Sequence, residues 1–583
     1  MDLFDVLSLI GGLCLFLFGM NLMGSALEKR AGGSLNTLLS KLTTNKMAGF
    51  LTGLGVTAVI QSSSATTVMV VGFVNSGIMT LKQAINVIMG ANVGTTVTAW
   101  LISLSGIEGD SLVLQLLKPT SFTPILALIG VIFFMFCKSG KKKDTGVILL
   151  GFATLMFGMD TMSAAVSGLR DVPEFANILL MFTNPILGVL AGAVLTGIIQ
   201  SSSASVGILQ ALSSTGAVTI GAAVPIIMGQ NIGTCVTALL SSVGTTKNAR
   251  RTAVVHLSFN IIGTVVLLTL FCIVRSLVEI PLISQSANEF SIAVAHSVFN
   301  ILCTAMLLPC AGLLEKLACK IIPDTKEPEA KQAQLDERLL ATPSIAIERC
   351  RVVAGEMATV SIDALRNALE VLRAYDADLA ARVKEQEDES DRYEDELGTY
   401  LVKLSAHDMS DADSAESAKL LHMISDFERI SDHAINIVES ARELHEKGMG
   451  FSEGAAREMD VICRAVLECL DMSLRCFLTN DQELARQVEP LEDVVDLLKD
   501  QLRARHVLRL QKGECSIEAG FVWNDLLTSL ERVSDHCSNI ASCVIEMSHA
   551  SMDLHGYLHG IREEDPKYTE RYEAYAKKYA LMS

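Results

Sequence analysis

The stretch GVTAVIQSSSATTVMVVG at residues 55–72 places four consecutive hydrogen-bonding side chains, Gln61 and Ser62–Ser64, in an otherwise apolar segment. Residues 47–60 before them and 65–75 after them are each too short to span a bilayer, which takes about 20 residues of helix. Backbone that leaves the helical pattern inside a membrane must be buried in protein or line a wet cavity. The pattern therefore predicts a re-entrant hairpin of two short helices with the polar residues at its tip.

The polar stretch belongs to a duplicated unit. QSSSA at 61–65 returns at 200–204, and GANVGTTVTA at 90–99 returns as GQNIGTCVTA at 229–238, both at an offset of 139 residues. The same offset relates FGMNLM to FGMDTM, and relates Gly49, Gly53 and Thr57 to Gly188, Gly192 and Thr196. About eighty residues align in this way without a gap, so we infer a duplicated transmembrane unit.

The number of crossings between the copies gives their relative orientation. Apolar segments suited to membrane crossing lie between equivalent points, at about 6–27, 84–105 and 121–137. Because three is an odd number, we expect the second copy to be inverted relative to the first. Inverted repeats with broken helices are the architecture of secondary transporters, whose substrate site lies near the bilayer midplane.

Charged residues give the orientation in the bilayer. With the N-terminus outside, the predicted inner loops hold twelve Lys and Arg and the outer loops hold three, which satisfies the positive-inside rule. We therefore expect seven crossings of a bacterial inner (plasma) membrane and a cytosolic C-terminal domain. The net charge is +5 up to Lys320 and −23 beyond it, and this acidity argues against nucleic-acid binding.

The hairpin tips have the chemistry of an ion site. N–H groups at the start of the second arm lack helical partners, and the helix dipole adds positive potential there, which suits an oxyanion such as phosphate. Hydroxyl, amide and carbonyl oxygens could instead coordinate Na⁺. Neither motif contains Lys or Arg, so bound cations would offset the anion. The alternative is that the serines only join helices by hydrogen bonds. The candidate residues in the two hairpins are Gln61, Ser62, Ser63, Ser64, Thr66, Gln200, Ser201, Ser202, Ser203 and Ser205.

Two further polar patterns lie in apolar segments. The pair Asn92/Thr95 and Asn231/Thr234, with Thr98 and Thr237 one turn further on, predicts a local helix break with a site role, against helix packing as the alternative. HLSFNIIGT at 256–264 is echoed by HSVFNILCT at 296–304, and His and Asn share one helix face in each. His256 and His296 are candidates for a proton relay. Helix-to-helix hydrogen bonding by Asn260 and Asn300 is the alternative.

At these motifs the sequence resembles the type II sodium/phosphate cotransporter family, which is defined by two inverted repeats that each carry QSSS. The resemblance covers about residues 1–315. It implies inorganic phosphate as the substrate and Na⁺ as the coupling ion, with Gln61–Ser64 and Gln200–Ser203 at the central site. It leaves open whether phosphate is imported or exported.

The acidic C-terminal half contains a second duplication. ERISDHAIN at 428–436 recurs as ERVSDHCSN at 531–539, in a region that is helical in period and nearly free of Pro and Gly. Two three-helix units predict an antiparallel all-α bundle. Acidic residues four apart lie on one helix face. They either bind metal or form a solvated surface.

The duplicated pattern E-R-[IV]-S-D-x-x-x-N resembles the PhoU-type domain of phosphate-sensing systems, over about residues 344–560. The resemblance implies a multinuclear site for divalent or iron-type metal ions. The implied ligands are Glu387, Asp391, Asp395, Glu428, Asp432, Glu492, Asp496, Glu531 and Asp535. Asn436 and Asn539 stand where acidic residues could, so this chain departs from a full acidic set.

The sequence as a whole predicts an all-α, polytopic membrane protein that carries phosphate with Na⁺ by alternating access and is regulated by its cytosolic bundle. The expected domains are a transporter at 1–315 (repeat 1 at about 1–137, repeat 2 at about 145–242, extra helices at about 252–315), a linker at 316–343, a PhoU-like bundle at 344–560 and a tail at 561–583. The expected partners are inorganic phosphate, the lipid bilayer and phosphate-signalling proteins, and the sequence is compatible with a homodimer.

Two other functions remain open on sequence grounds. One is a carrier, or an exporter, of another oxyanion such as sulfate on the same scaffold. The other is a membrane-anchored phosphate sensor. The sequence carries no P-loop, no G-x-S-x-G motif and no Ser/His/Asp set that the topology would bring together, so we do not expect an enzyme.

Overall fold

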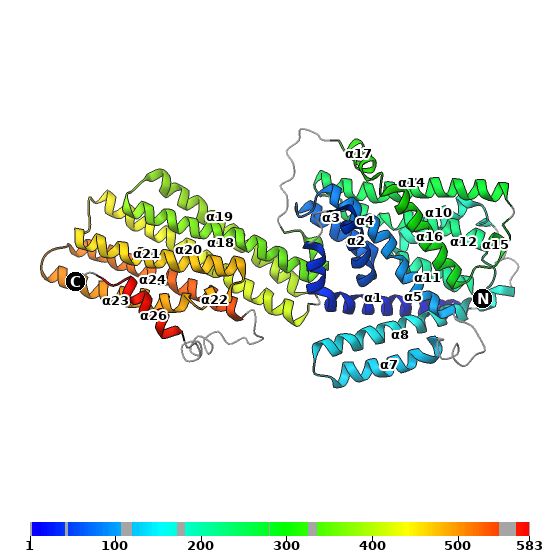
Figure 1. Ribbon diagram of the computed structural model, residues 1–583, viewed down its shortest axis with the longest axis horizontal. Coiled ribbons are helices and arrows are strands. Elements are labelled where there is room, and N and C mark those ends of the chain that lie inside the picture. Colours follow the sequence, from blue (N-terminus) through cyan, green and yellow to red (C-terminus); the bar gives the residue numbers. More distant parts are fainter. Residues whose placement is uncertain are drawn as a thin grey trace. The chain divides into compact units, whose positions relative to one another are not determined.

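A computed structural model describes residues 3–40, 45–106, 119–171, 181–278, 280–323, 335–407, 409–546 and 567–581. Within these ranges the secondary structure is helical, apart from one isolated bridge between Thr219 and Ser286 (Figure 1). This confirms the predicted all-α class. The chain divides into two compact units, Met1–Ile345 and Ala346–Ser583.

The first unit contains the two predicted repeats. Repeat 1 comprises α1 (Leu3–Ser40), α2 (Lys46–Ile60), α3 (Ser63–Asn75), α4 (Leu81–Gly94) and α5 (Thr96–Ser103), followed by η1 (Leu104–Gly106) and α7 (Pro119–Phe136). Repeat 2 comprises α8 (Gly140–Ser167), η2 (Gly168–Asp171), α10 (Pro185–Ile199), α11 (Ser202–Ser213), α12 (Ile220–Gly233) and α13 (Cys235–Ser241). Helices α2 and α3 form the first hairpin and α10 and α11 the second. Helix α2 packs on α4, α10 packs on α12, and α1 packs along α8.

Glycine explains how closely these helix pairs approach. A Cβ atom added at Gly53 of α2 would lie 2.7 Å from the carbonyl carbon of Val87 on α4, and one at Gly90 would lie 2.8 Å from Leu54 N. Gly192 and its neighbours repeat this between α10 and α12, where the added Cβ would lie 2.9 Å from a backbone nitrogen. Small residues at helix contacts let backbones meet in a membrane. The hairpins are therefore held against the helices that bear the Asn-Gly breaks.

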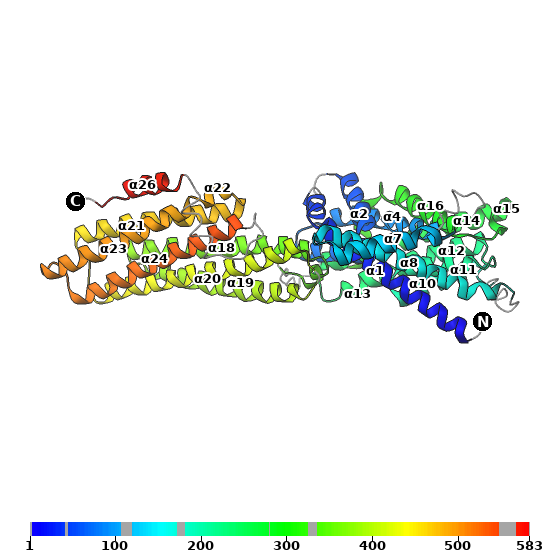
Figure 2. The ribbon, with the colours of Figure 1, turned by 90° about the horizontal axis from the view of Figure 1, so that it is seen from below.

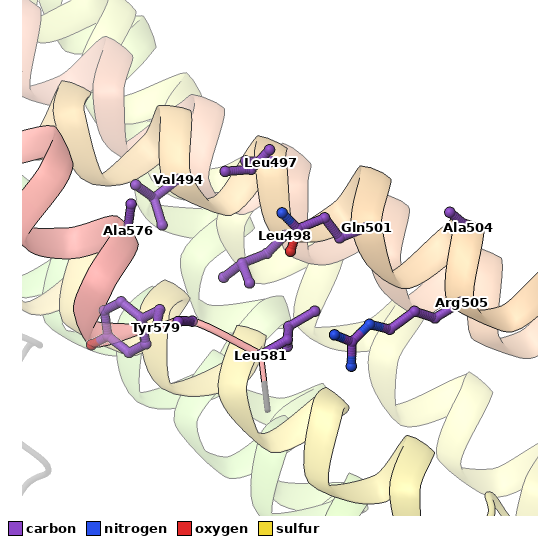
Figure 3. Close-up of a pocket in the computed structure, with 10 residues that line it drawn as sticks. Val494, Leu497, Leu498, Gln501, Ala504, Arg505, Ala576, Tyr579 and Leu581 are labelled. Atoms are coloured by element: carbon purple, nitrogen blue, oxygen red, sulfur yellow. The ribbon is translucent and has the colours of Figure 1, made fainter. Parts of the chain in front are cut away.

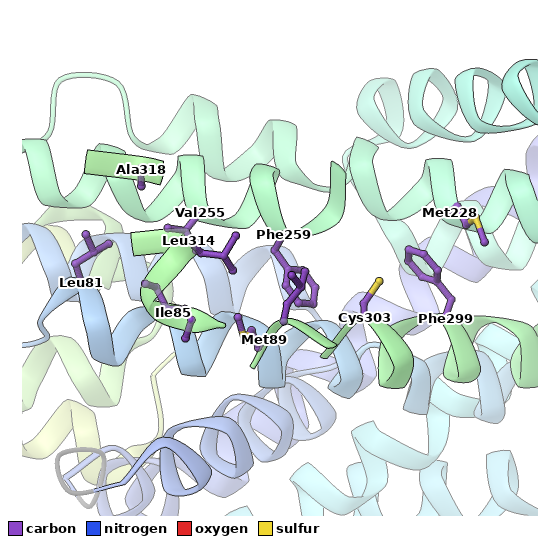
Figure 4. Packing of buried hydrophobic residues seen from close by; sticks show 12 residues of the cluster. Leu81, Ile85, Met89, Met228, Val255, Phe259, Phe299, Cys303, Leu314 and Ala318 are labelled. Atoms are coloured by element: carbon purple, nitrogen blue, oxygen red, sulfur yellow. The ribbon is translucent and has the colours of Figure 1, made fainter. Parts of the chain in front are cut away.

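The helices that follow the repeats obey the same two-fold relation. They are α14 (Lys247–Leu277), α15 (Pro281–Ser284), α16 (Glu289–Leu307) and α17 (Ala311–Ile321). Helix α14 packs on α3, α4, α12 and α13, whereas α16 packs on the equivalent helices α11, α12, α4 and α5. A shared apolar core joins them to both repeats, with Phe259 of α14, Cys303 of α16 and Met89 of α4 in one cluster (Figure 4). The segment expected as extra helices thus belongs to the symmetric body.

Six helical segments among the described residues are long and apolar enough to cross a membrane. They are Leu3–Arg30, Leu81–Gly106, Gly140–Ser167, Ile220–Ser241, Lys247–Leu277 and Glu289–Leu307. The hairpin arms Lys46–Ile60, Ser63–Asn75 and Pro185–Ile199 are shorter, as is Ser121–Phe136, the third of the crossings expected between the repeats. The chain is therefore a multi-pass membrane protein. The outer-loop charges at 107–118 and 172–180 lie outside the described residues.

The second unit is a bundle of long helices that run side by side in both views (Figures 1 and 2). Its first three-helix group is α18 (Pro343–Arg373), α19 (Ala377–Ser405) and α20 (Asp411–Glu446). The second is α21 (Glu453–Thr479), α22 (Gln482–Ala485), α23 (Val488–Gln511) and α24 (Ile517–Glu546), in which α22 is a single short turn. Helices α20 and α24 pack on each other and join the groups. Helix α26 (Tyr568–Lys578), in the expected tail, packs on α23.

The segment expected to be a linker, 316–343, is helical at both ends. Helix α17 continues to Ile321, and η3 (Glu337–Ala341) precedes α18. The cause is apolar residues among the charges. Ala318 of α17 and Leu339 of η3 are both fully buried, at 0% exposed. Charge and proline alone therefore overstate the length of the connection. Residues 324–334 lie outside the described ranges.

Candidate functional site

Both hairpin tips turn through an unusual backbone conformation. Gln61 has a φ of 58° and Gln200 a φ of 57°, in the left-handed region that non-glycine residues rarely occupy. Each caps the preceding helix, donating its backbone N–H to the carbonyl of Thr57 at 2.8 Å or of Thr196 at 2.7 Å. Strained backbone of this kind persists at functional sites because the surrounding structure enforces it. Because the same conformation occurs at both equivalent positions, the two hairpin tips share one local structure.

A serine then starts the second arm of each hairpin. The Oγ of Ser62 accepts from Ala65 N at 3.1 Å, and that of Ser201 accepts from Ala204 N at 3.2 Å. Only two residues separate α2 from α3, and two separate α10 from α11. Each tip therefore presents the first N–H groups of a helix, together with its positive dipole end. This arrangement suits an anion.

Thr66 and Ser205 hold the arms of their hairpins together. Thr57 Oγ1 donates to Thr66 Oγ1 at 3.1 Å, and Thr196 Oγ1 donates to Ser205 Oγ at 2.8 Å. Thr66 and Ser205 are fully buried. Their contacts explain why a hydroxyl stands at these positions without assigning it to a ligand.

The tip of the first hairpin contacts both repeats. Thr98 Oγ1 donates to Gln61 Oε1 at 2.9 Å within repeat 1, and Thr237 Oγ1 of repeat 2 lies 3.5 Å from Ser64 Oγ. Helix α3 packs on α13, and α11 packs on α5, so each second arm lies against the opposite repeat. The structure thus brings the QSSS tip together with the threonines that follow the Asn-Gly breaks.

The two tips differ in exposure although their sequences match. Gln61 is 6% exposed, whereas Gln200 is exposed. Ser63, Ser202 and Ser203 are buried at 5–6% exposed. One tip is therefore covered and the other is open at its glutamine.

The second predicted pair lies at helix breaks, as expected. Helix α4 ends at Gly94 and α12 at Gly233, and each is followed directly by a short helix. Asn92 Nδ2 donates to the Ile88 carbonyl and Asn231 Nδ2 to the Ile227 carbonyl, both at 2.9 Å. The adjacent threonines, Thr95 and Thr234, donate to carbonyls of the preceding turn at 3.0 and 2.9 Å. Each Asn thus turns its amide nitrogen to its own helix, and the oxygen of Asn92 lies 3.5 Å from Asn260 Nδ2 of α14.

Fully buried charge is scarce in the first unit. Among its described residues, the charged side chains below a tenth exposed are Arg251, near the start of α14, and Asp336. The QSSS motifs contain no charged residue. An anion bound there would meet hydroxyls, amides and helix dipoles rather than a fixed cation.

A short segment inside the expected linker connects the two repeats to each other. This clasp segment, residues 336–342, lies within the first unit. Asp336 Oδ2 accepts from Nδ2 of Asn75 at 2.7 Å, at the end of the first hairpin. Arg338 Nε donates to the carbonyl of Ser241, the last residue of α13, at 2.6 Å, and its guanidinium pairs with Asp336 at 3.1 Å. The clasp segment therefore connects a hairpin arm of repeat 1 to repeat 2.

The second unit gathers two groups of carboxylates. Asp391 and Glu394 of α19 meet Glu428 of α20, with one oxygen of each within 4.8 Å of the others. Glu492 and Asp496 of α23 meet Asp535 of α24 in the same way. Five of these six residues are among those that the sequence implied. Glu394 was missed because the acidic ladder was extended in steps of four residues.

The other implied ligands have partners of their own. Lys384 pairs with Glu387, Arg429 lies 3.4 Å from Asp432, and Lys499 Nζ lies 2.8 Å from Glu531 Oε1. Asp395 does not belong to either group of three found among the described residues. These four remain proposed ligands, and Asp432 lies beside Glu428 of the first group.

Mutual repulsion and burial disturb the titration of both groups. Burial, followed by the charges of Asp432 and Glu394, raises the pKa of Glu428 to about 7. Burial and the neighbouring Glu489 and Asp496 raise the pKa of Glu492 to about 9. Raised pKa values of this kind show that nearby positive charge does too little to stabilise the ionised carboxylates. All-oxygen donor sets suit hard divalent cations or iron, so the residues present fit the implied metals.

The pocket in Figure 3 is a different feature of the second unit. Its volume is about 510 Å³, and it lies between α23 and the segment at the end of α26. Leu498, Gln501 and Arg505 line one side, and Tyr579 lines the other. None of the carboxylates implied as metal ligands lines it, so its chemistry is separate from theirs.

Sequence comparisons give the family. The family described as Na⁺/Pi-cotransporter matches residues 15–164 and 169–295, and the PhoU domain family matches residues 354–441 and 460–544. YqeW of Bacillus subtilis, an uncharacterized protein, is 30% identical over 313 residues, which is 53% of this chain and 95% of YqeW. The chain belongs to the Na⁺/Pi-cotransporter family. It carries a PhoU domain after the membrane unit.

Full-length relatives share both parts. YjbB of Salmonella typhimurium, named as a candidate inorganic phosphate export protein, is 26% identical over 554 residues, covering 93% of this chain and 97% of YjbB. The crystal structure of PhoU from Pseudomonas aeruginosa is 25% identical, with a TM-score of 0.34, and it covers 35% of this chain and 97% of that chain. The family assignment confirms the sodium/phosphate and PhoU resemblances of the sequence. It favours a transporter over an enzyme.

Proposed function

We propose that this protein is a Na⁺-coupled symporter of inorganic phosphate that works by alternating access. The observation that carries the proposal is the pair of left-handed, serine-capped tips at Gln61 and Gln200, the first of which contacts the opposite repeat through Ser64 and Thr237. Inverted repeats that meet at broken helices are suited to exposing one central site to either side in turn. Membership of the Na⁺/Pi-cotransporter family supports phosphate and Na⁺ as the ions carried together.

The phosphate site in this proposal is formed by the hairpin residues named from the sequence, in which Thr66 and Ser205 brace the arms. Asn92, Thr95, Asn231 and Thr234 lie beside them in the proposal. Hydroxyls and helix N-termini bind the oxyanion, and bound Na⁺ offsets its charge because the motifs hold no Lys or Arg. The same logic makes anion binding depend on Na⁺. We further propose a bacterial inner membrane, an external N-terminus and a cytosolic second unit, in line with the distribution of Lys and Arg.

The direction of transport follows from the gradients in a symporter. Phosphate enters when the Na⁺ gradient is inward and dominant, and it leaves when internal phosphate and Na⁺ outweigh that gradient. The name of the relative YjbB refers to export. One site can serve both directions, so the direction is a property of the cell rather than of the tips.

Regulation would reach the transporter through the clasp segment. Asp336 and Arg338 tie the end of α3 to the end of α13, and the chain continues from there into α18. Occupation of the acidic clusters by metal would stabilise one form of the bundle. The form of the bundle would then act through the clasp segment to favour or oppose movement of the first hairpin. Phosphate-signalling proteins are the partners that this arrangement would serve.

Phosphate flux into proteoliposomes tests the function. With an imposed inward Na⁺ gradient, the wild-type protein should accumulate ³²P-phosphate, and collapse of that gradient should stop accumulation. Ser63→Ala should abolish flux with no loss of folded protein. Ser103→Ala is the matched control, because the Ser103 hydroxyl only donates to the Trp100 carbonyl of its own helix at 2.8 Å. Equal flux in the two variants would remove the tip serines from the mechanism.

Two other functions have distinct outcomes in the same assay. Inhibition by unlabelled sulfate at least as strong as that by unlabelled phosphate would identify a carrier of another oxyanion. Stoichiometric phosphate binding with no net flux under any gradient would identify a membrane-anchored sensor.

A further inference from the structure

The second unit contains a cluster of buried nitrogen atoms that the carboxylate groups do not use. Among its described residues, the buried side-chain polar atoms without a hydrogen-bond partner are Arg503 Nε, His506 Nε2, Arg509 Nε and Nη2, and Trp523 Nε1. All of them are nitrogens, and all lie on α23 and α24, which pack on each other. Buried polar groups in proteins are nearly always paired, so this concentration of unpaired nitrogens needs a physical explanation.

Three of these residues gather around one indole ring. Arg509 Cζ lies 5.2 Å from the centroid of the Trp523 ring, and the His506 ring stacks on the same indole with 5.9 Å between centroids. Trp523 is 1% exposed and His506 is 9% exposed. A Cβ atom added at Gly520 would lie 2.7 Å from His506 Nε2, so the glycine keeps side-chain atoms away from that nitrogen. Cys515 Sγ lies 3.9 Å from His506 Nδ1, and with the thiol as donor to Nδ1 the ring proton is on Nε2.

The guanidinium of Arg509 is paired on one side and unpaired on the other. Its Nη1 pairs with Glu458 Oε2 at 2.6 Å, and Nη1 of Arg505 pairs with Glu458 Oε1 at 2.9 Å. The Arg509 side chain is only 12% exposed. The unpaired Nε and Nη2 form the edge by which arginine donates two parallel hydrogen bonds to an oxyanion. Because a guanidinium stays protonated in proteins, both atoms are donors.

The charge around this edge favours an anion. Two guanidinium groups share one carboxylate, so these three side chains carry a net positive charge in a region whose net charge is −23. Burial and the charge of Arg509 lower the pKa of His506, so its imidazole is neutral at pH 7. Water donates as well as accepts, and it would need an acceptor beside a carboxylate, Glu458, that already accepts from both arginines. An oxyanion only accepts.

We propose that the unpaired edge of Arg509, together with Trp523 Nε1 and His506 Nε2, binds one small oxyanion of the phosphate or sulfate type. Arg505 lines the pocket of Figure 3 and lies one helical turn from Arg509, so the pocket brings solvent close to the site. Binding here is separate from the proposed transport. Its use as a phosphate signal to the membrane unit rests on the proposed function.

Tryptophan fluorescence tests the site, because the sequence has two tryptophans, Trp100 and Trp523. Trp100→Phe in the full-length protein in nanodiscs leaves Trp523 as the only reporter. Phosphate and sulfate are titrated separately without Na⁺, and choline chloride keeps the ionic strength constant. We expect a saturable change in emission, and the anion with the lower midpoint is the preferred ligand.

Two lysine variants in this single-tryptophan protein decide which donors bind. Arg509→Lys keeps the charge beside Glu458 but removes the two-donor edge, so the anion midpoint should rise by about tenfold or more. Arg505→Lys is the matched control, since it makes the same change on the same helix beside the same carboxylate. Its midpoint should stay within about twofold of the parent protein.

The outcomes separate this inference from the proposed function. The absence of a saturable change with either anion overturns it, and so does an equal rise of the midpoint in both lysine variants. If Arg509→Lys does not fold, calorimetry of Trp523→Phe in the same Na⁺-free buffer decides. Loss of the indole N–H should weaken binding by about fivefold, and unchanged affinity would count against the site. Intact Na⁺-driven ³²P-phosphate flux without anion binding at Trp523 refutes the site alone, whereas anion binding without flux refutes transport alone.

Discussion

Gly53→Ala should separate the first hairpin from the helix that supports it. The new Cβ would lie 2.7 Å from the Val87 carbonyl carbon and 3.0 Å from Ala91 N, and both are backbone atoms that cannot rotate away. Carbon atoms pack at about 3.5–4.0 Å, so the two helices must part by about 1 Å. Overpacking of this kind costs about 1–3 kcal/mol, and a backbone clash belongs at the upper end of that range. Gly55→Ala is the control, because nothing lies within 4 Å of a Cβ at Gly55.

The assay combines thermal stability with transport. We expect Gly53→Ala to lower the melting temperature by about 5 °C or more and to reduce ³²P-phosphate flux, because a shift of about 1 Å misplaces the donors of the tip. Gly90→Ala clashes at the same helix crossing. The double variant should therefore lose less stability than the sum of the losses in the two single variants. If Gly53→Ala matches Gly55→Ala in both measurements, the close packing of the hairpin on α4 does not position the tip.

Three further perturbations address the second unit and the clasp segment. The pKa of Glu492 is raised from 4.5 to about 9, so the folded state holds an extra proton between these values and stability falls as the pH rises through this window. Chemical unfolding in EDTA should show that the free energy of unfolding falls by at most about 6 kcal/mol from pH 5 to pH 9. Glu492→Gln should reduce this fall. An equal fall in the wild-type protein and the variant would contradict the argument. Lys499→Met frees the carboxylate of Glu531, so calorimetric Mn²⁺ affinity should rise by about tenfold, and a fall would show that Lys499 does not compete with metal. Asp336→Ala breaks the bond to Asn75 and should raise phosphate flux. Unchanged flux would exclude a clasp segment that restrains the hairpin.

The hairpins could be predicted because two independent features of the sequence agree. The arms around Gln61 are too short to cross, and the same interruption returns at Gln200 after a gap-free offset of 139 residues. The offset also pairs Gly53 with Gly192, and the structure shows close helix packing at both positions. The left-handed backbone at the two glutamines could not be predicted, because glutamine has no intrinsic preference for that conformation and the surrounding contacts impose it.

The metal-site residues show where a spacing rule fails. Four residues of an α-helix advance the side chain by slightly more than one turn, so a ladder written in steps of four drifts around the axis by about 40° per step. Asp391 meets Glu428 of the neighbouring helix, and the third member of that group is Glu394 rather than Asp395. Glu394, three residues from Asp391, returns to the contact from the other side. Which of the two completes the cluster depends on the rotation of α19 against α20, and one sequence does not encode that rotation in a readable pattern.

The unequal tips give a physical account of how one duplicated sequence can provide two states. Gln61 is covered and accepts a hydrogen bond from Thr98, while Gln200 is exposed. Thr237, the equivalent of Thr98, lies instead beside Ser64 of the opposite repeat. If the repeats exchange conformations, Thr237 turns to Gln200 and Thr98 turns to Ser203, so the same hydroxyls bond in either state and no donor is lost between them. Under the proposed alternating access, rocking of one repeat against the other would then cost little in hydrogen bonding and would leave the bound ions to decide which tip is covered.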